Sequence, residues 1–469
     1  MTTNVGRIKN NLKNIFDLTE PFFFGYGFPI LVGLLTAFFW YLGISAISIF
    51  VFSMFGLYIF VAYRDSSPIL PLLFGISISF SSLDRLANFT EFLYFTPALI
   101  GLVLHFILHP IKKIKIGKLF FPLLVIFFVM SIAGLGSSYY LGFSSGLATI
   151  FGVGLSTIIV YLYFKQYIGE KKNFRFDKYL CITIISIAGA VSIQLFNLHF
   201  LKWSGVDVNK VNIHFFGWGY STQIGTLFLL AYPCTFYLMV KDKIVLPYLF
   251  IGLFFIIIIF LSAVDGPAAL LCFGTPILMI YTHNRLNDKN KRIFWNFYGF
   301  ALLILCTTII IFLDELMPIF NHLFNSFLDD TGRTQIYLKA IEIFKAFPFL
   351  GGGFATHPGQ VGLIPYNYHS TFFQILATMG IVGLIGYALY YFVRIKLLTK
   401  NYKDVNIYFT ISFILFESYA MIDCAEFNGI PLMIILTVMM VCIEFANDKN
   451  KFNDEELPLF MKTKYLSHR

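Results

Sequence analysis

Uninterrupted apolar runs long enough to cross a bilayer recur along almost the whole of this chain. A helical run of about 20 residues matches the hydrocarbon core. Lipid cannot satisfy backbone polar groups, so only helices or closed barrels cross it, and these runs are continuous rather than alternating. The sequence therefore predicts an all-α, polytopic integral membrane protein. The predicted spans lie near residues 22–41, 43–63, 68–82, 88–109, 119–139, 142–164, 178–199, 222–240, 245–262, 264–281, 294–314, 372–397, 405–423 and 428–446.

Composition agrees with this class. The chain is 58% hydrophobic and only 13% charged, whereas about a quarter of the residues in a soluble domain are charged. Two apolar blocks are divided on length alone, so we expect about 12–14 transmembrane helices. The predicted organisation is a tail at 1–21, spans over 22–314, a large loop at 315–371, further spans over 372–446 and a tail at 447–469.

The Lys and Arg residues predict the orientation. With the N-terminus in the cytoplasm, 28 of the 34 lie on the cytoplasmic side, including Arg394 at the end of a span. The outer side keeps the other six, which are Arg85, Lys202, Lys210, Arg333, Lys339 and Lys345. Cytoplasmic loops carry the excess of Lys and Arg. We therefore expect both termini in the cytoplasm and the 315–371 loop on the extracytoplasmic side.

Several other classes of protein are not indicated. The net charge of +9 follows from the loop asymmetry and suits anionic lipid headgroups, so no nucleic-acid partner is expected. No P-loop or dinucleotide fingerprint is present. The six cysteines form no CxxC pair, which argues against a disulfide framework or a zinc site. The basic start precedes an apolar run without a small-residue cleavage site, which predicts an uncleaved first span.

The 315–371 loop is the longest polar interruption, and its middle predicts a helix. From Arg333 the sequence reads RTQIYLKAIEIFKAFP, with apolar residues at helical spacing on one face and Lys339, Glu342 and Lys345 on the other. This pattern predicts an amphipathic helix on the membrane interface or on the outer end of the bundle. Pro348 stops it. The three glycines 351–353 then predict a sharp turn.

The order of these segments resembles the bacterial O-antigen polymerase and ligase family. The resemblance rests on the helix, the PFLGGGF turn and the sequence YHSTFFQILATMGIVGLIGY, over roughly residues 331–392. Ser370 stands where the family usually has Asn. Many members carry Ser-Arg-Gly where this chain has AVDGPAALL, so Asp265 replaces a family arginine and no second arginine is assigned there.

The resemblance implies a glycosyltransferase of the bacterial cytoplasmic membrane, with its site outside. Its donor and acceptor would be polyprenyl-diphosphate-linked glycans, and a chain-length regulator and a flippase would be its partners. Arg333 would hold the diphosphate, because guanidinium forks match phosphate oxygens. His369 would act as general base, because imidazole titrates near neutral pH. No metal or cofactor is required by this scheme. Further candidate substrate-binding residues are Arg85, Lys210, His214, Tyr368 and Ser370.

Each candidate also has a structural interpretation. Arg333 would equally anchor an interfacial helix to lipid phosphate, and His369 would equally be a polar residue at a span entrance. Asp329 and Asp330 fit a helix cap better than a metal site. Glu417 lies within a predicted span, where an unpaired carboxylate is costly, so we expect it to have a partner that packs helices together.

Three functional classes remain open. The favoured one is a lipid-linked glycan transferase. Within this class we prefer a polymerase that extends repeat units of a surface polysaccharide, such as an exopolysaccharide or a capsule, over a ligase that moves a finished glycan to an acceptor. A flippase for the same lipids would favour related halves and several deep charges, and only Glu417 is clearly deep. A non-catalytic envelope partner would tolerate replacement of Arg333 and His369.

Overall fold

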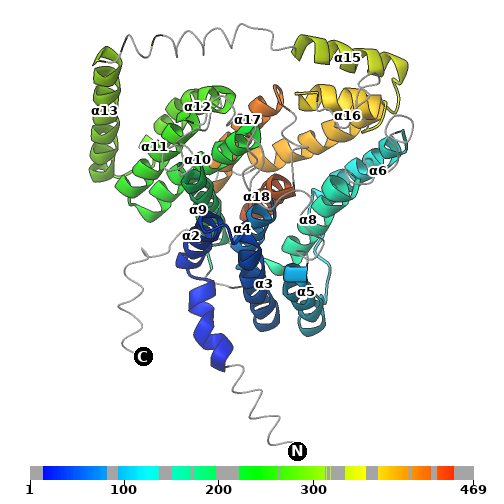
Figure 1. The fold of residues 1–469 in the computed structure, drawn as a ribbon, viewed down its shortest axis with the longest axis horizontal. Helices are drawn as coiled ribbons and strands as arrows, with labels where there is room; N and C mark the ends of the chain where they lie inside the picture. The colour runs from blue at the N-terminus through cyan, green and yellow to red at the C-terminus, as the bar shows by residue number, and fades with distance from the viewer. Residues whose placement is uncertain are drawn as a thin grey trace, which may run out of the picture. The chain divides into compact units, whose positions relative to one another are not determined.

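The computed structural model describes most of the predicted spans. The described residues are 14–81, 93–136, 150–169, 171, 174–196, 221–261, 265–311, 313, 317, 333–354, 368–400, 404–423 and 430–447. They form helices and, within these ranges, no strand (Figure 1). The predicted all-α class is therefore confirmed.

The chain divides into two compact units, which are described separately. The first comprises residues 1–117, 160–224 and 435–452. It contains a helix at Asn14–Phe23 and the greater parts of α8 (Ser156–Tyr167) and α18 (Ile430–Asn447). Its other helices are α2 (Gly27–Tyr41), α3 (Ser45–Ala62), α4 (Ile69–Ser81), α5 (Thr96–Leu108) and α9 (Phe176–Phe196).

Small residues let the helices of the first unit approach closely. A Cβ on Gly33 of α2 would lie 2.7 Å from the carbonyl oxygen of Ser186 on α9. A Cβ on Gly101 of α5 would lie 2.7 Å from Cα of Leu57 on α3. Helices in lipid associate through such close van der Waals contact, because apolar burial gives little advantage there. These glycines fix the α2–α9 and α3–α5 packing.

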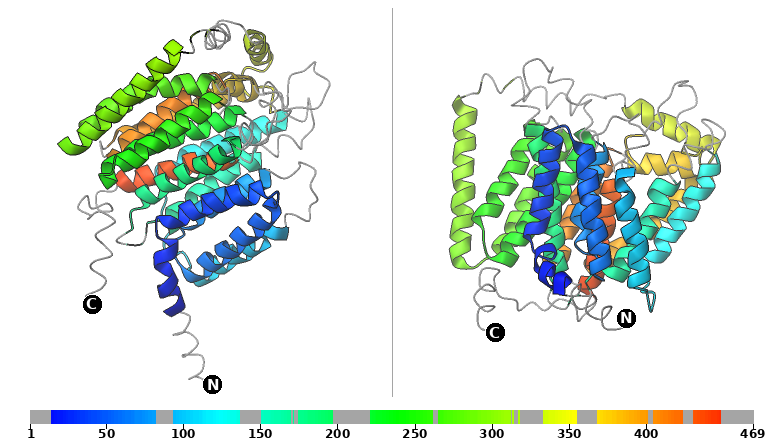
Figure 2. Two further views of the ribbon diagram at one scale, coloured as in Figure 1. Left: turned by 60° about the vertical axis from the view of Figure 1, so that its left-hand side comes forward. Right: turned by 60° about the horizontal axis from the view of Figure 1, so that its bottom comes forward.

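The second unit carries the candidate site. It comprises residues 118–159, 225–434 and 453–469. Its helices are α6 (Phe120–Gly136), the π-helix η3 (Ile150–Leu155), most of α10 (Ser221–Asp242), α11 (Leu246–Leu261), α12 (Asp265–His283), α13 (Asp288–Ile311), α15 (Arg333–Ala346), α16 (Thr371–Thr399) and α17 (Asp404–Ala420). Both views of Figure 2 place α15 beside the first half of α16.

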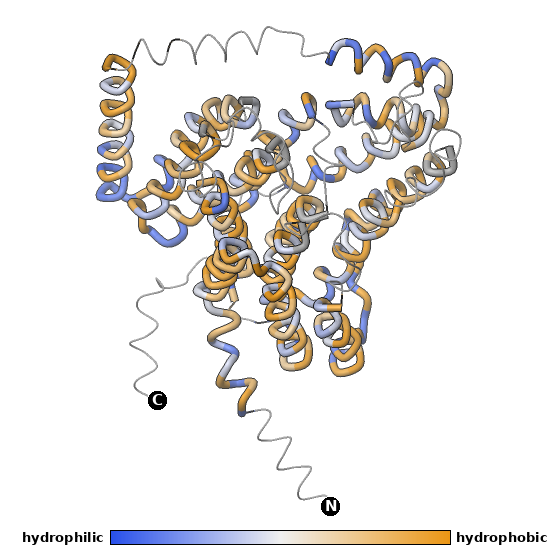
Figure 3. Tube along the Cα trace, viewed as in Figure 1, coloured by the Kyte–Doolittle hydropathy of each residue, from blue (hydrophilic) through white to orange (hydrophobic). Residues whose placement is uncertain are grey.

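Every predicted span overlaps a described helix, and Figure 3 shows that these helices are apolar along most of their length. Among the described residues, five helices are long and apolar enough to cross a membrane, namely Ser45–Ala62, Phe176–Phe196, Ile224–Asp242, Asp288–Ile311 and Thr371–Thr399. Helices Asn14–Phe23 and Gly27–Tyr41 form a sixth candidate with a 72° bend. The bend lies near the start of the predicted span 22–41, most of which is the helix Gly27–Tyr41.

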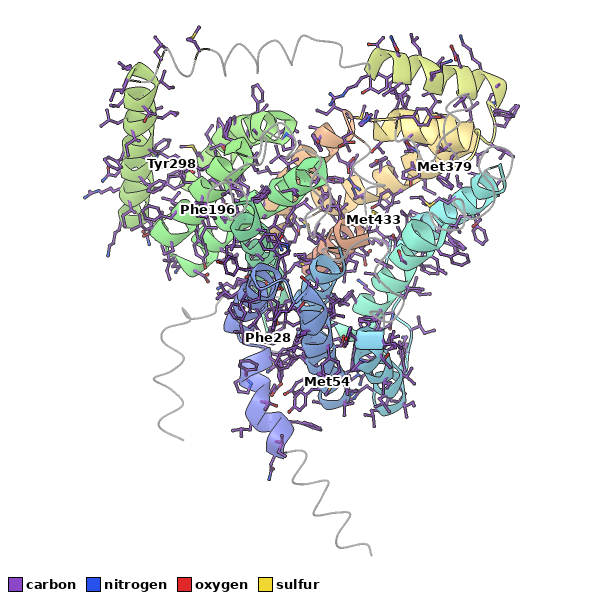
Figure 4. The ribbon with its side chains drawn as sticks, viewed as in Figure 1. Phe28, Met54, Phe196, Tyr298, Met379 and Met433 are labelled. Carbon is purple, nitrogen blue, oxygen red and sulfur yellow. The ribbon has the colours of Figure 1, made fainter. Side chains whose placement is uncertain are left out.

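The first half of α16 packs against α6 inside the second unit. Met379 is buried there with Ile126, Val129 and Met130 of α6 (Figure 4). Farther along α16, Gly386 also approaches Val129, with only 3.2 Å between its notional Cβ and the valine side chain. This apolar contact holds the beginning of α16 in place, and the candidate site lies immediately before that beginning.

Candidate functional site

Helix α15 begins at Arg333 and ends at Ala346, as its amphipathic pattern predicts. It ends two residues before Pro348, because a proline disfavours helical backbone in the residue that precedes it. Ala340 and Ile343 are buried against Ala377 of α16 and against Tyr368, with Ile336 and Phe373 at the edge of this cluster. Arg333 itself is exposed. The apolar face of α15 therefore docks on α16 and leaves its first residue accessible.

Helix α16 is broken at Gly380, where the backbone has φ +60° and ψ −153°. In an unbroken helix the N–H of Ile381 would donate to the carbonyl of Ala377. Here Ile381 donates to the carbonyl of Pro348 at 2.9 Å, and the Ala377 carbonyl accepts from the N–H of Gly352 at 2.8 Å. The glycine turn after α15 thus satisfies the backbone groups that the break exposes.

Only glycine fits at this junction. A Cβ on Gly351 would lie 2.3 Å from the carbonyl carbon of Thr378, and a Cβ on Gly380 would lie 2.7 Å from the Gly351 nitrogen. Both glycines also have positive φ, at 70° and 60°. The turn therefore brings two backbone segments together and fixes α15 relative to the first half of α16.

The backbone of His369 has the left-handed conformation, with φ +47°. A residue other than glycine pays roughly 1–3 kcal/mol for such a backbone and needs neighbours that hold it. The hydroxyl of Tyr337 on α15 donates to the carbonyl of His369 at 3.1 Å. The N–H of the preceding residue, Tyr368, donates to Oε1 of Gln374 at 2.9 Å. Hydrogen bonds on both sides therefore hold His369 in place.

The side chain of His369 faces a carboxylate. Its Nδ1 lies 3.6 Å from Oδ1 of Asp423, and the exposed fractions of the two side chains are 44% and 8%. The hydroxyl of Tyr419 donates to Oδ2 of the same carboxylate at 3.2 Å. A carboxylate beside Nδ1 favours the tautomer with a proton on Nδ1, which leaves Nε2 as a free base. An imidazole placed beside a carboxylate in this way is chemically able to act as a base.

The topology explains how His369 and Asp423 meet. His369 lies just before α16 begins, and Asp423 lies just after α17 ends. These consecutive helices return the chain to the same end of the unit. Asp423 is not among the site residues predicted from the sequence. A usable signal exists, because an acidic residue ends the predicted span 405–423 on the side where His369 begins the span 372–397.

Some of the predicted site residues lie at the candidate site, some are buried, and some lie outside the described residues. Arg333 lies one helical turn before Tyr337, which puts both on the same face of α15, and Tyr337 binds the His369 backbone.

Tyr368 and Ser370 were predicted to bind substrate, but both side chains are buried. Tyr368 fills the α15–α16 cluster, and Ser370 stands at the N-cap position of α16. The other predicted contacts, Arg85, Lys210 and His214, lie outside the described residues.

Glu417 has an ion-pair partner, as expected for a carboxylate within a predicted membrane span. It forms an ion pair with Arg394 of α16, whose side chain is 2% exposed. The predicted span 372–397 includes Arg394 near its end. Arg394 lies inside α16, and its guanidinium is 4.7 Å from the ring centre of Phe413. Burial of the long arginine stem beside aromatic rings makes this placement possible.

The fold and the site define an integral membrane protein of packed helices that holds a histidine, with a carboxylate facing it, beside the amphipathic helix α15. Residues 249–388 match the family model described as O-antigen ligase. This confirms the resemblance found from residues 331–392, and the matched segment includes Arg333 and His369. The match supports activity of the O-antigen ligase or polymerase type and lipid-linked glycan substrates. A comparison with curated proteins gave no match.

Proposed function

We propose that this protein polymerises polyprenyl-diphosphate-linked oligosaccharide repeat units on the outer side of the cytoplasmic membrane. One observation carries the proposal. A partly exposed histidine, held in an unusual backbone conformation and facing a carboxylate, lies beside the helix that begins with Arg333. The match to O-antigen ligase covers both His369 and Arg333 and supports the choice of reaction.

Arg333 would bind the diphosphate of the donor. Its guanidinium is exposed at the first turn of α15, where the positive end of the helix dipole also favours an anion. The negative charge on the diphosphate increases as the bond from the sugar to the lipid carrier breaks. A fixed cation at that point stabilises the transition state more than the ground state. Arg333 would therefore activate the leaving group.

His369 would act as the general base. Nε2 accepts the proton of an acceptor hydroxyl, and the oxygen attacks the anomeric carbon of the donor from the face opposite the diphosphate. A new glycosidic bond forms as the bond from the anomeric carbon to the diphosphate oxygen breaks, and the polyprenyl diphosphate leaves with that electron pair. The anomeric configuration inverts. Asp423 stabilises the imidazolium that results.

The test measures the length of glycan on the carrier lipid with purified protein in vesicles. We expect His369→Ala and Arg333→Ala each to reduce chain extension at least about 100-fold, because a general base alone contributes that much. Lys339→Ala is the matched control, since Lys339 is an exposed cation on the same helix. A normal ladder of long chains from both site variants would overturn the proposal.

Ligation is the second candidate, because the matching family model is described as an O-antigen ligase. A ligase would use the same oriented base and the same leaving group but a different acceptor. Supplying the vesicles with either a second lipid-linked repeat unit or a lipid A core distinguishes the two. Products formed only with the lipid A core would reassign this chain as a ligase.

A further inference from the structure

A long groove runs between α16 and α17 of the second unit. Its volume is about 870 Å³. On α16 it extends along the second half of the helix from Leu384 to Thr399, a rise of roughly 20 Å. Several residues at its rim are exposed, among them Ile395, Ile414 and Met421. Because α16 is long and apolar enough to cross a membrane and α17 is a shorter apolar helix, we infer that this exposed apolar rim faces lipid.

The lining of the groove is almost entirely apolar, with aliphatic and aromatic side chains on both walls. The charged exception is the Arg394–Glu417 pair, which links α16 to α17 and is internally neutralised. Rings of Tyr390, Tyr391 and Phe413 surround the guanidinium at 4.7–5.2 Å. The pair therefore connects the two walls without presenting a net charge to an occupant.

One end of the groove lies at the candidate site. Thr371 lines the groove and is two residues from His369, and Met421 lines it two residues before Asp423. Thr371 is 3% exposed, and its hydroxyl oxygen has no hydrogen-bond partner. A buried hydroxyl without a partner costs free energy unless a ligand supplies one. The groove thus joins an apolar channel to an unsatisfied polar group beside the histidine.

We propose that this groove binds the hydrocarbon tail of the lipid-linked donor, with the diphosphate end at Thr371 and the sugar beside His369. The inference depends on the proposed function for the identity of the head group. The tail matches the apolar lining, and the lateral opening lets it enter from the bilayer while the head stays at the interface. The Arg394–Glu417 pair fixes the spacing of the walls that the tail contacts.

The experiment compares donors that carry the same sugar diphosphate on a long polyprenyl tail or on a geranyl tail. Ala388→Trp fills the groove, because Ala388 lines it and is exposed. We expect this variant to raise KM for the long-tail donor at least about tenfold, which corresponds to about 1.4 kcal/mol of lost binding. KM for the geranyl donor stays unchanged. Ile385→Trp is the control, since Ile385 is exposed on the same helix but outside the lining.

Photo-crosslinking with a diazirine-bearing polyprenyl diphosphate supplies a readout that needs no activity. We expect labels on α16 and α17 that Ala388→Trp removes and Ile385→Trp retains. Equal changes in KM for both donors, labels elsewhere, or labelling abolished by excess phospholipid would overturn the groove assignment. Labelling in the groove by a protein that transfers no sugar would instead reject only the proposed function.

Discussion

Among single residues, Asp423 and His369 have different proposed roles. Asp423 positions the imidazole, and His369 accepts the proton. We expect Asp423→Asn to lower kcat at least about tenfold, because an amide no longer favours the productive tautomer of the histidine. KM for the lipid donor should stay close to that of the wild type, since Asp423 is nearly buried beside the imidazole. Steady-state kinetics in vesicles measure both quantities, and a change in KM alone would contradict this role.

His369→Asn tests the histidine without disturbing its backbone. Asparagine tolerates the left-handed conformation that His369 adopts at φ +47°, so the thermal unfolding temperature should remain that of the wild type. Glycan transfer should fall about 100-fold or more. A variant that keeps both its stability and its activity would show that the imidazole takes no part in the reaction.

Some of these residues could be predicted from the sequence and others could not. His369 and Arg333 could be singled out because motif order and helical spacing mark them in the chain. Asp423 could not be assigned, because 54 positions separate it from His369 and only the return of the chain along α17 brings the two together. The partner of Arg394 could not be assigned for the same reason, since Glu417 lies on another helix.

At the scale of elements, the junction between the glycine turn and α16 determines where the site is held. We expect Gly351→Ala to destabilise the protein by at least about 1–3 kcal/mol, because its Cβ would meet the Thr378 backbone and its φ is positive. Thermal unfolding in detergent measures the loss. Gly299→Ala is the control, because nothing lies within 4 Å of its notional Cβ, and its stability should be unchanged or slightly higher.

The ion pair between α16 and α17 gives a second prediction at this scale. Arg394→Met leaves Glu417 without its partner, and breaking a buried pair costs about 3–5 kcal/mol. Because Glu417 is 29% exposed, we expect a value at the low end of that range. Glu417→Leu should cost more, since Arg394 is 2% exposed. The double variant should recover most of the stability in the same unfolding assay, and a merely additive loss would argue against the pair.

Hydropathy predicted the helices well, because every predicted span overlaps a helix among the described residues. Helical spacing also predicted α15 from its first residue. The break in α16 was not predicted, because Gly380 lies in a run that remains apolar on both sides and the hydrogen bonds that compensate the break come from Pro348 and the glycine turn. Sequence periodicity records which face is buried, but it does not record which backbone groups are satisfied by a distant segment.

At the scale of the whole molecule, the reaction depends on the side of the membrane that α15 faces. The excess of Lys and Arg in alternate loops predicts that the 285–292 loop is cytoplasmic and that α15 is outside. A lipid-linked donor presented on the outer leaflet can reach Arg333 and His369 only under that orientation. The sidedness of two exposed lysines therefore tests the assignment independently of any catalytic assay.

Single cysteines introduced into a cysteine-free parent report this orientation directly. Lys339 on α15 and Lys289 at the start of α13 are both exposed, so a cysteine at either position is open to a maleimide. We expect a membrane-impermeant maleimide to label Lys339→Cys in intact spheroplasts and Lys289→Cys only after permeabilisation. The reverse pattern would place the histidine in the cytoplasm, where an acceptor sugar on the outer leaflet cannot meet it, and glycosyl transfer outside the cell would then require a different site.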